Sequence, residues 1–401
     1  MAGRLFLNKE ILSFSKSLRT HNQQTRSFSG NLHNPLKITF ADKLSNDNPS
    51  SISRINLIEK IAAQDIAHPP RGIASIAQAM RGNLYKSAKS ISLTEKPRVA
   101  IMTGFWIKKR TIIGIDGKEM ILGDASETDG PVGCAHLAAG LVRAGIPVQM
   151  VTDEPNASAV KVALDESIRE QNMVIPFQII PWTIPTSLSS KSSDHDIVKK
   201  ASVAIQMLIK KWKEEEITHV MALERVGPAV SDGCPHNMIG LDISAFTAPL
   251  HLLYEGGPWV KLAVGDGGNE MGMGSVDPKL IAKSIFNGKG DIMACKVKAD
   301  YLQVCGVSNW GGPSLLFALA LLRPELADLL LAGLTLEKDK EILKATVEKG
   351  PAVDGIRGTK ELSVDNMDWA VHASVLEQMW NAYKGGSVEI IGYDCDTRPK
   401  H

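Results

Sequence analysis

The chain has 401 residues, of which 44% are hydrophobic, enough for a sizeable core in one large or two modest domains. Its formal net charge is +1 and its aromatic content is 5%, so neither a basic field nor a stacking surface indicates nucleic-acid binding. No apolar stretch reaches the roughly 18 residues of a membrane span, so we expect no membrane partner either. The five scattered cysteines fit reduced thiols inside a cell or organelle.

The first thirty residues have a composition of their own. They carry five basic residues and many serines against one acid, Glu10, and can form a basic amphipathic helix. This pattern predicts an organellar transit peptide over residues 1–30, addressed to the mitochondrial matrix, with a plastid as the alternative. Residues 31–60 are polar and rich in serine and asparagine, so we expect a disordered or poorly ordered linker there. A single α/β domain is expected over residues 61–401.

Short apolar runs alternate with longer amphipathic stretches through this domain. The apolar runs predict strands at residues 98–105, 147–152, 177–181, 219–223, 262–264 and 301–304. Helices are expected at residues 131–141, 157–171, 196–213, 336–349 and 366–383, and from Asp277-Pro278 onward. A hairpin turn at Asp116-Gly117 and a last edge strand at residues 388–392 complete the prediction. The recurring order predicts a mostly parallel central sheet with helices on both faces, a Rossmann-like three-layer α/β sandwich.

The most distinctive stretch is KLAVGDGGNEMGMG, at residues 261–274. A buried strand there leads into a loop of glycines, two acids and an amide: Gly265, Asp266, Gly267, Gly268, Asn269 and Glu270. Glycine permits positive φ and a close approach of the backbone to a ligand. Because α/β folds bind ligands at the carboxyl ends of their strands, we expect this loop to form part of a binding site.

Acidic residues follow the predicted strands at several points. In chain order they are Asp129, Asp153, Glu154, Glu224, Asp266 and Glu270. The carboxyl ends of parallel strands meet at one edge of a sheet, so these acids are expected to gather there and to hold a cation. Two cations are candidates: a divalent metal with oxygen ligands, Mg²⁺ or Mn²⁺, and the ammonium group of an amino-acid substrate.

Each acid also has a structural explanation. Asp129 and Asp153 could cap helices, and Asp266 could bond to the backbone of its own turn. Glu224 could form a local ion pair with Arg225.

The same edge offers groups for an anion. Gly130 begins a helix whose amides favour a carboxylate or phosphate, and the amides of the glycine loop could do likewise. The expected substrate-binding residues are Gly130, Asp153, Glu154, Gly267, Gly268, Asn269 and Asn309.

Five stretches form a longer pattern: Met102–Phe105, Glu127–Pro131, Thr152–Glu154, Ala222–Arg225 and, above all, Val264–Gly274. In this order they resemble the mitochondrial D-glutamate cyclase family, specifically its C-terminal domain, over residues 75–395. The resemblance implies a lyase that converts D-glutamate to 5-oxo-D-proline with loss of water.

This reaction suits an acidic edge, because the substrate amine must lose a proton before it attacks the γ-carboxyl. As a hypothesis, Asp266 or Glu270 holds and deprotonates the amine. Asp129 or Glu224 would supply the acid, or ligate a metal together with Asp266. Amides near Gly130 and in the glycine loop would hold the substrate carboxylates.

Two other functions stay open at this point. A metal-dependent hydrolase or phosphoryl-transfer enzyme could use the same acids, and a non-catalytic subunit could bind a metabolite with them. Longer animal members of the family carry another domain, for which the roughly one hundred residues before the first core strand are too few. We expect either a homo-oligomer or a separate protein that supplies this N-terminal domain.

Overall fold

The structure is a computed structural model that describes residues 47–68, 70–113, 119–169, 173–183, 191–285 and 289–391. The predicted leader at residues 1–30 and most of the predicted linker lie outside the described residues. The linker prediction is wrong from residue 48 on, because helix α2 (Pro49–Ala62) begins there with an Asn48 cap. Its isoleucines at 55, 58 and 61 recur at helical spacing and are fully buried, a signal that the polar composition around them obscured.

Six parallel strands form the central sheet, in the order β10-β9-β8-β1-β6-β7. Their bounds are β1 (Val99–Met102), β6 (Val148–Asp153), β7 (Phe177–Ile180), β8 (His219–Leu223), β9 (Val260–Gly265) and β10 (Tyr301–Val304). In the middle of the sheet, Met102 lies opposite Val151 on one side and Ala222 on the other. All six strands fall on predicted apolar runs, so the parallel sheet is confirmed.

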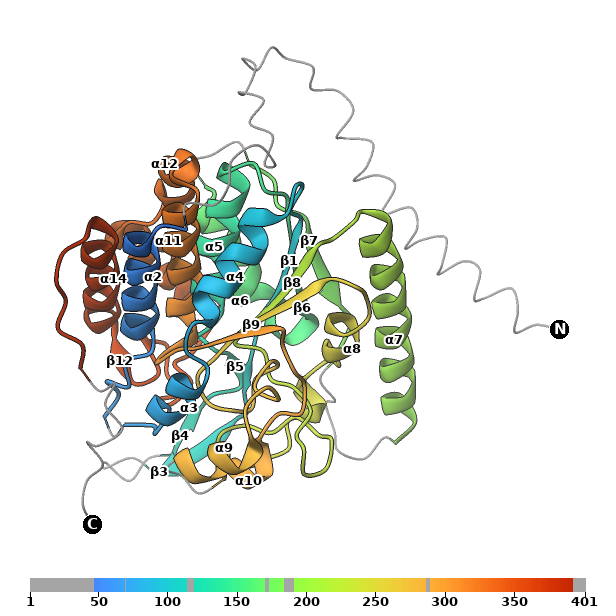
Figure 1. Ribbon diagram of the computed structural model, residues 1–401. Helices are drawn as coiled ribbons and strands as arrows, with labels where there is room; N and C mark the ends of the chain where they lie inside the picture. The colour runs from blue at the N-terminus through green and yellow to red at the C-terminus, as the bar shows by residue number, and fades with distance from the viewer. Residues whose placement is uncertain are drawn as a thin grey trace. The chain divides into compact units, whose positions relative to one another are not determined.

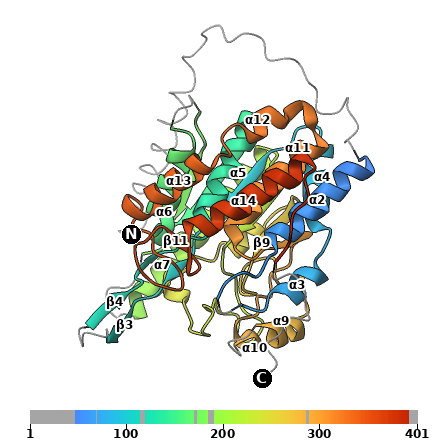
Figure 2. The ribbon, with the colours of Figure 1, turned by 90° about the vertical axis from the view of Figure 1, so that its left-hand side faces the viewer.

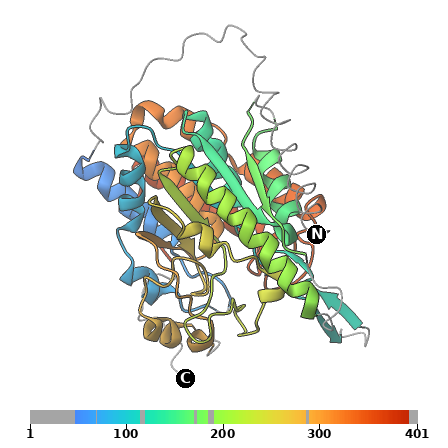
Figure 3. The ribbon, with the colours of Figure 1, turned by 90° about the vertical axis from the view of Figure 1, so that its right-hand side faces the viewer.

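Helices cover both faces of this sheet, which confirms the predicted three-layer arrangement (Figure 1). One layer contains α2, α4 (Asn83–Leu93), α5 (Pro131–Arg143), α6 (Ala157–Ser167), α11 (Gly311–Leu322), α12 (Ala327–Leu331), α13 (Leu336–Glu348) and α14 (Trp369–Lys384). On the other face, α7 (Lys191–Glu214) runs along the sheet beside α8 (His251–Tyr254), as Figure 3 shows. Three short helices, α3 (Ala74–Ala79), α9 (Pro278–Ser284) and α10 (Gly290–Met293), lie together at one end of the sheet (Figures 1 and 2).

Three small antiparallel pairs accompany the sheet: β2 (Trp106–Ile107) with β5 (Ala125–Ser126), β3 (Arg110–Ile113) with β4 (Glu119–Leu122), and β11 (Ser363–Val364) with β12 (Met367–Asp368). The β3–β4 pair confirms the predicted hairpin, while its expected turn at Asp116-Gly117 lies outside the described residues. The predicted edge strand at residues 388–392 is wrong, because residues 388–391 join no sheet. Ile391 instead donates its N–H to the side chain of Gln64.

The parallel sheet fixes where the functional loops lie. The segments that follow β1, β6, β8, β9 and β10 all leave the same edge of the sheet, its carboxyl edge. None of the helices in the described part of the chain is long and apolar enough to cross a membrane.

Candidate active site

Three carboxyl groups meet at the carboxyl edge and are called here the acidic cluster: Asp129, Glu224 and Asp266. Asp129 precedes α5, Glu224 directly follows β8, and Asp266 directly follows β9. Each offers one carboxylate oxygen within 4.8 Å of the other two, and the three residues are only 1%, 5% and 4% exposed. The prediction that acids from different strand ends gather there therefore holds for these three.

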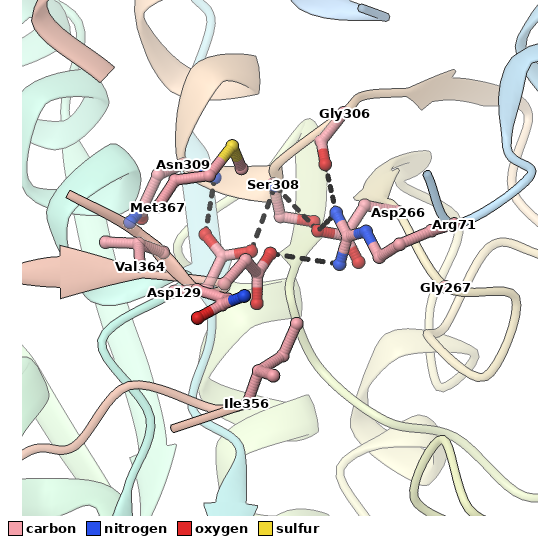
Figure 4. A network of polar contacts seen from close by, with 12 residues as sticks. Arg71, Asp129, Asp266, Gly267, Gly306, Ser308, Asn309, Ile356, Val364 and Met367 are labelled. Atoms are coloured by element: carbon pink, nitrogen blue, oxygen red, sulfur yellow. Dashed lines mark hydrogen bonds and ion pairs between the residues drawn. The ribbon is translucent and has the colours of Figure 1, made fainter. Parts of the chain in front are cut away.

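Two members of the cluster share a backbone donor. The amide of Ser308, which begins the turn η4 (Ser308–Trp310), donates to Asp129 Oδ2 at 3.0 Å and to Asp266 Oδ2 at 3.2 Å. The amide of Asn309 donates to Asp129 Oδ1 at 2.7 Å (Figure 4). The two carboxyl groups therefore lie side by side on one donor, where like charge opposes ionisation of both at once.

The buried position of the cluster determines which members are ionised. Burial raises the pKa of Asp129 and that of Glu224 well above their usual ranges, and neighbouring acids raise both further. Burial raises the pKa of Asp266 to about 6, and the guanidinium of Arg71 opposes this rise. Burial and like charge thus favour the protonated forms of Asp129 and Glu224, whereas Arg71 favours the ionised form of Asp266.

The guanidinium of Arg71 reaches the cluster from the connector between α2 and α3. Its Nη2 donates to Asp266 Oδ2 at 2.9 Å and to the carbonyl oxygen of Gly306 (Figure 4), and its Nη1 pairs with Asp365 Oδ2 at 3.0 Å. Asp65 fixes the connector, because its carboxylate accepts three consecutive N–H groups, beginning with that of Arg71. A cation is therefore built into the acidic site.

Two further buried acids flank the cluster. Glu127 lies two residues before Asp129, and Asp365 lies in the two-residue turn between β11 and β12, where both turn residues have positive φ. Burial raises the pKa of Glu127 well above its usual range. It raises that of Asp365 to about 7, with Arg71 opposing the rise. The site consequently contains more carboxyl groups than it can ionise at neutral pH.

The carboxylate of Glu270, from the same loop as Asp266, is occupied by backbone donors. Its Oε1 accepts the N–H groups of Asp266 at 3.0 Å and Gly267 at 2.6 Å, and its Oε2 accepts that of Gly268 at 2.8 Å. The loop thus closes on its own carboxylate, helped by the positive φ of 102° at Gly268. The loop amides that we expected to hold a substrate carboxylate are already bonded.

Asn309 and Asn269 are likewise occupied within the protein. Asn309 Oδ1 accepts the N–H groups of Gly130 at 2.8 Å and Gly133 at 2.9 Å, so this side chain caps α5 from outside the helix. Asn269 Nδ2 donates to the carbonyl oxygen of His236 at 2.8 Å. Both asparagines, and the amide of Gly130, therefore support the shape of the site.

Asp153 and Glu154 are not part of the cluster. Asp153 is fully buried and forms an ion pair with Arg225, which also donates to the carbonyl oxygen of Gly104. Arg225 therefore does not form the local pair with Glu224 that was an alternative from the sequence; it pairs with the end of β6, which β1 separates from β8 in the sheet. Glu154 is exposed and accepts the N–H of Trp182, so neither acid is available at the cluster.

Several polar atoms around the cluster have no hydrogen-bond partner within the described residues. Among them are Glu224 Oε2 and the hydroxyl oxygen of Ser308, both buried. The three cluster carboxylates are the oxygen ligands that Mg²⁺ or Mn²⁺ prefers, so they could hold such an ion.

The sequence-based prediction missed three residues of the site. Arg71 lies in the connector between two helices and does not follow a predicted strand, so the neighbouring sequence gave no indication of its role. Glu127 belongs to the stretch that supplied Asp129 but was not singled out. The pair Asp365-Asn366 forms a two-residue hairpin turn, and acid–amide pairs of this kind are a recognisable turn signal.

These features define the class: an α/β protein whose parallel sheet carries a cluster of buried carboxyl groups at its carboxyl edge. The family model described as "D-glutamate cyclase-like, C-terminal" matches residues 58–380, and the chain belongs to this family. The chain is also similar to the human protein named "D-glutamate cyclase, mitochondrial", at 26% identity over 280 residues. That match covers 63% of this chain and 43% of the human protein, so the chain spans less than half of its relative's length.

Proposed function

We propose that the chain is a D-glutamate cyclase, a hydro-lyase that forms 5-oxo-D-proline and water from D-glutamate. Membership of the family and the printed name of the human relative support this proposal. The observation that carries it is the acidic cluster, in which the carboxyl groups of Asp129, Glu224 and Asp266 lie within 4.8 Å of one another in a buried site.

The proposed reaction needs both kinds of carboxyl group. The substrate begins with an ammonium group and a γ-carboxylate, and the product contains a lactam N–H. A carbon–nitrogen bond forms, a carbon–oxygen bond of the γ-carboxyl breaks, and two of the three ammonium protons leave with that oxygen as water. A base must therefore take a proton from nitrogen, and an acid must deliver one to oxygen.

We assign these roles by protonation state and by the bonds that each group already makes. Asp266 is the base, because its carboxylate is ionised at neutral pH and Arg71 supports that charge. Asp129 or Glu224 is the acid, because burial and neighbouring acids raise the pKa of each and so favour its protonated form. Glu270 is a weaker candidate for the base than it was from sequence, since three N–H groups already occupy its oxygens.

The negative oxygen of the tetrahedral intermediate needs donors. The hydroxyl of Ser308, a residue whose backbone N–H donates to both Asp129 and Asp266, has no partner among the described residues and could donate to it. A divalent ion held by the cluster would supply the same stabilisation, so Mg²⁺ or Mn²⁺ is included in the test. The remaining task is to hold the flexible chain of the substrate in an attack-ready conformation, for which a buried site is suited.

The test is to incubate the purified protein with D-glutamate and with L-glutamate, with and without Mg²⁺ or Mn²⁺, and to measure 5-oxoproline. We expect product from D-glutamate, and we expect Asp266→Asn to lower the rate about 100-fold or more, the usual cost of losing a general base. Glu154→Gln is the matched control, because Glu154 lies on the same edge but outside the cluster. Absence of product from D-glutamate under all conditions would reject the cyclase.

We also propose delivery to the mitochondrion. The basic, acid-poor leader at residues 1–30 supports this, together with the name of the human relative. A fluorescent protein fused behind residues 1–30 should colocalise with a matrix marker. Accumulation in plastids, or diffuse fluorescence, would contradict it.

A further inference from the structure

The acidic site poses a charge problem for an amino dicarboxylate substrate. Five buried carboxyl groups surround it, namely Glu127, Asp129, Glu224, Asp266 and Asp365. The ammonium group of the substrate matches this environment, but its two carboxylates do not. Each carboxylate must find a donor or a cation there, or the substrate would be repelled.

The two carboxylates of the substrate differ in what they need. The γ-carboxyl loses an oxygen as water, so a neighbouring proton donor suits it. The α-carboxylate keeps its negative charge from substrate to product. It therefore needs a permanent cation, which a proton-holding carboxyl group cannot provide.

Amides that could hold an α-carboxylate are already used in this protein. Those of Gly267 and Gly268 donate to Glu270, and that of Gly130 donates to Asp129 and Asn309. Of the cationic side chains in the described residues, Arg71 is the only one with a hydrogen bond or ion pair to any of the five carboxyl groups.

The guanidinium of Arg71 uses three of its five N–H groups, so the Nε–H and one N–H of Nη1 are left. Both Nη atoms are bonded, to Asp266, Asp365 and the carbonyl oxygen of Gly306, while the buried Nε–H has no partner. The side chain of Arg71 is 13% exposed, and its backbone is held by Asp65, so the guanidinium is positioned before any ligand arrives. A fixed guanidinium with an unused N–H is suited to a carboxylate.

We propose that Arg71 is the residue that binds the α-carboxylate of the substrate, through its free Nε–H edge, and that it makes the site specific for amino acids with that group. This inference rests on the proposed function, because it names the substrate class of the same site. Arg71 then serves twice: it supports the charge of Asp266 and anchors the one substrate group that does not react. The ammonium group is thereby directed to Asp266, next to the anchor.

Two substrate fragments separate this role from a general effect on the site. D-2-aminobutyrate has the ammonium group and the α-carboxylate but lacks the γ-carboxyl. 4-Aminobutyrate has the ammonium group and the reacting carboxyl at the same spacing but lacks the α-carboxylate. Their dissociation constants are measured by calorimetry on the full chain carrying Arg71→Gln, Arg71→Lys or no substitution.

We expect Arg71→Gln to weaken D-2-aminobutyrate binding roughly 10- to 100-fold more than 4-aminobutyrate binding, the value of a hydrogen bond between charged groups. Any loss through the charge of Asp266 is common to both fragments, because both carry the ammonium group. Arg71→Lys keeps the charge but loses the planar donor edge, so an intermediate loss is expected. Arg357→Gln is the matched control, because Arg357 bonds to Asn366 beside Asp365 without touching the cluster. Thermal unfolding of each variant identifies any that fails to fold. If Arg71→Gln does not fold, the two fragments are compared on Arg71→Lys instead.

The outcomes are distinct from those of the cyclase test. Equal weakening of both fragments, no weakening of either, or no binding of D-2-aminobutyrate to the unsubstituted protein would overturn the role of Arg71. Selective loss of D-2-aminobutyrate supports it, whether or not D-glutamate is cyclised. If product forms, the same substitution should raise KM for D-glutamate more than it lowers kcat.

Discussion

Replacing Glu224 with glutamine should stabilise the protein. Glu224 is 5% exposed, its Oε2 has no hydrogen-bond partner, and its backbone has a positive φ of 47°. An unpaired buried polar atom costs about 1–3 kcal/mol. The side-chain amide that Glu224→Gln introduces can instead donate to the carboxyl oxygens of Asp129 and Asp266, which lie within 4.8 Å of those of Glu224.

The gain should depend on pH, because burial raises the pKa of Glu224 above its ordinary value of 4.5. Below that value Glu224 is protonated in both the folded and the unfolded protein, and ionisation costs the fold nothing. As pH rises, the unfolded chain ionises first, so the protein with glutamate loses stability that the glutamine variant keeps. The advantage of Glu224→Gln should therefore be smallest near pH 4 and largest above pH 7.

Thermal and urea unfolding in EDTA at pH 5 and pH 8 measure this difference. A gain of about 1–3 kcal/mol corresponds to a rise of about 1–4 °C in Tm for a domain of this size. Glu255→Gln, at an exposed position after α8, should change stability by no more than about 0.5 kcal/mol at either pH. A variant less stable than the parent at pH 8, or a gain of equal size at both pH values, would refute the reasoning.

Three further predictions follow from the same contacts. The raised pKa of Asp266, about 6 against an ordinary 3.8, should cost the unliganded protein about 3 kcal/mol between pH 4 and pH 7; a flat stability profile in EDTA would contradict it. Gly130→Ala should lower the free energy of unfolding by about 1–3 kcal/mol, because φ is +94° and the new Cβ would lie 2.5 Å from Thr103 Oγ1; unchanged urea unfolding would count against this contact. Asp153→Asn should cost about 3–5 kcal/mol by leaving the buried Arg225 unpaired; preserved stability with weaker substrate binding would favour a binding role instead.

The fold was largely predictable because its strands are short, apolar and separated by helical stretches. A parallel strand that is buried on both faces has an uninterrupted apolar sequence. The predicted bounds of the strand at residues 301–304 are those of β10 in the structure. The errors occurred where one local signal overrode another. Serine and asparagine around α2 suggested disorder although its isoleucines recur at helical spacing, and the apolar run at residues 388–391 pairs with no strand in the described structure.

The site was predictable only in part, for a physical reason. Asp129, Glu224 and Asp266 could be grouped because parallel strands bring their ends to one edge. Which carboxylate stays available depends on donors that arrive from elsewhere in the fold, and the sequence does not reveal these. The carboxylate of Glu270 accepts backbone N–H groups of its own loop. Arg71 belongs to a connector almost two hundred positions away from its partner Asp266 in the sequence.

The acids at this edge fall into two groups, according to whether all their carboxylate oxygens have hydrogen-bond donors. Glu270 and Asp153 are satisfied by backbone N–H groups or a guanidinium, so they stabilise the loops that surround the site. Glu224 retains an unsatisfied oxygen and a strained backbone, features that cost stability and are kept where function requires them. Neutral substitutions should therefore act in opposite directions: stability falls when a satisfied acid is replaced and rises when Glu224 is replaced. If both substitutions lowered stability alike, Glu224 would belong with the supporting acids, and the assignment of a proton donor at that position would have to pass to Asp129 alone.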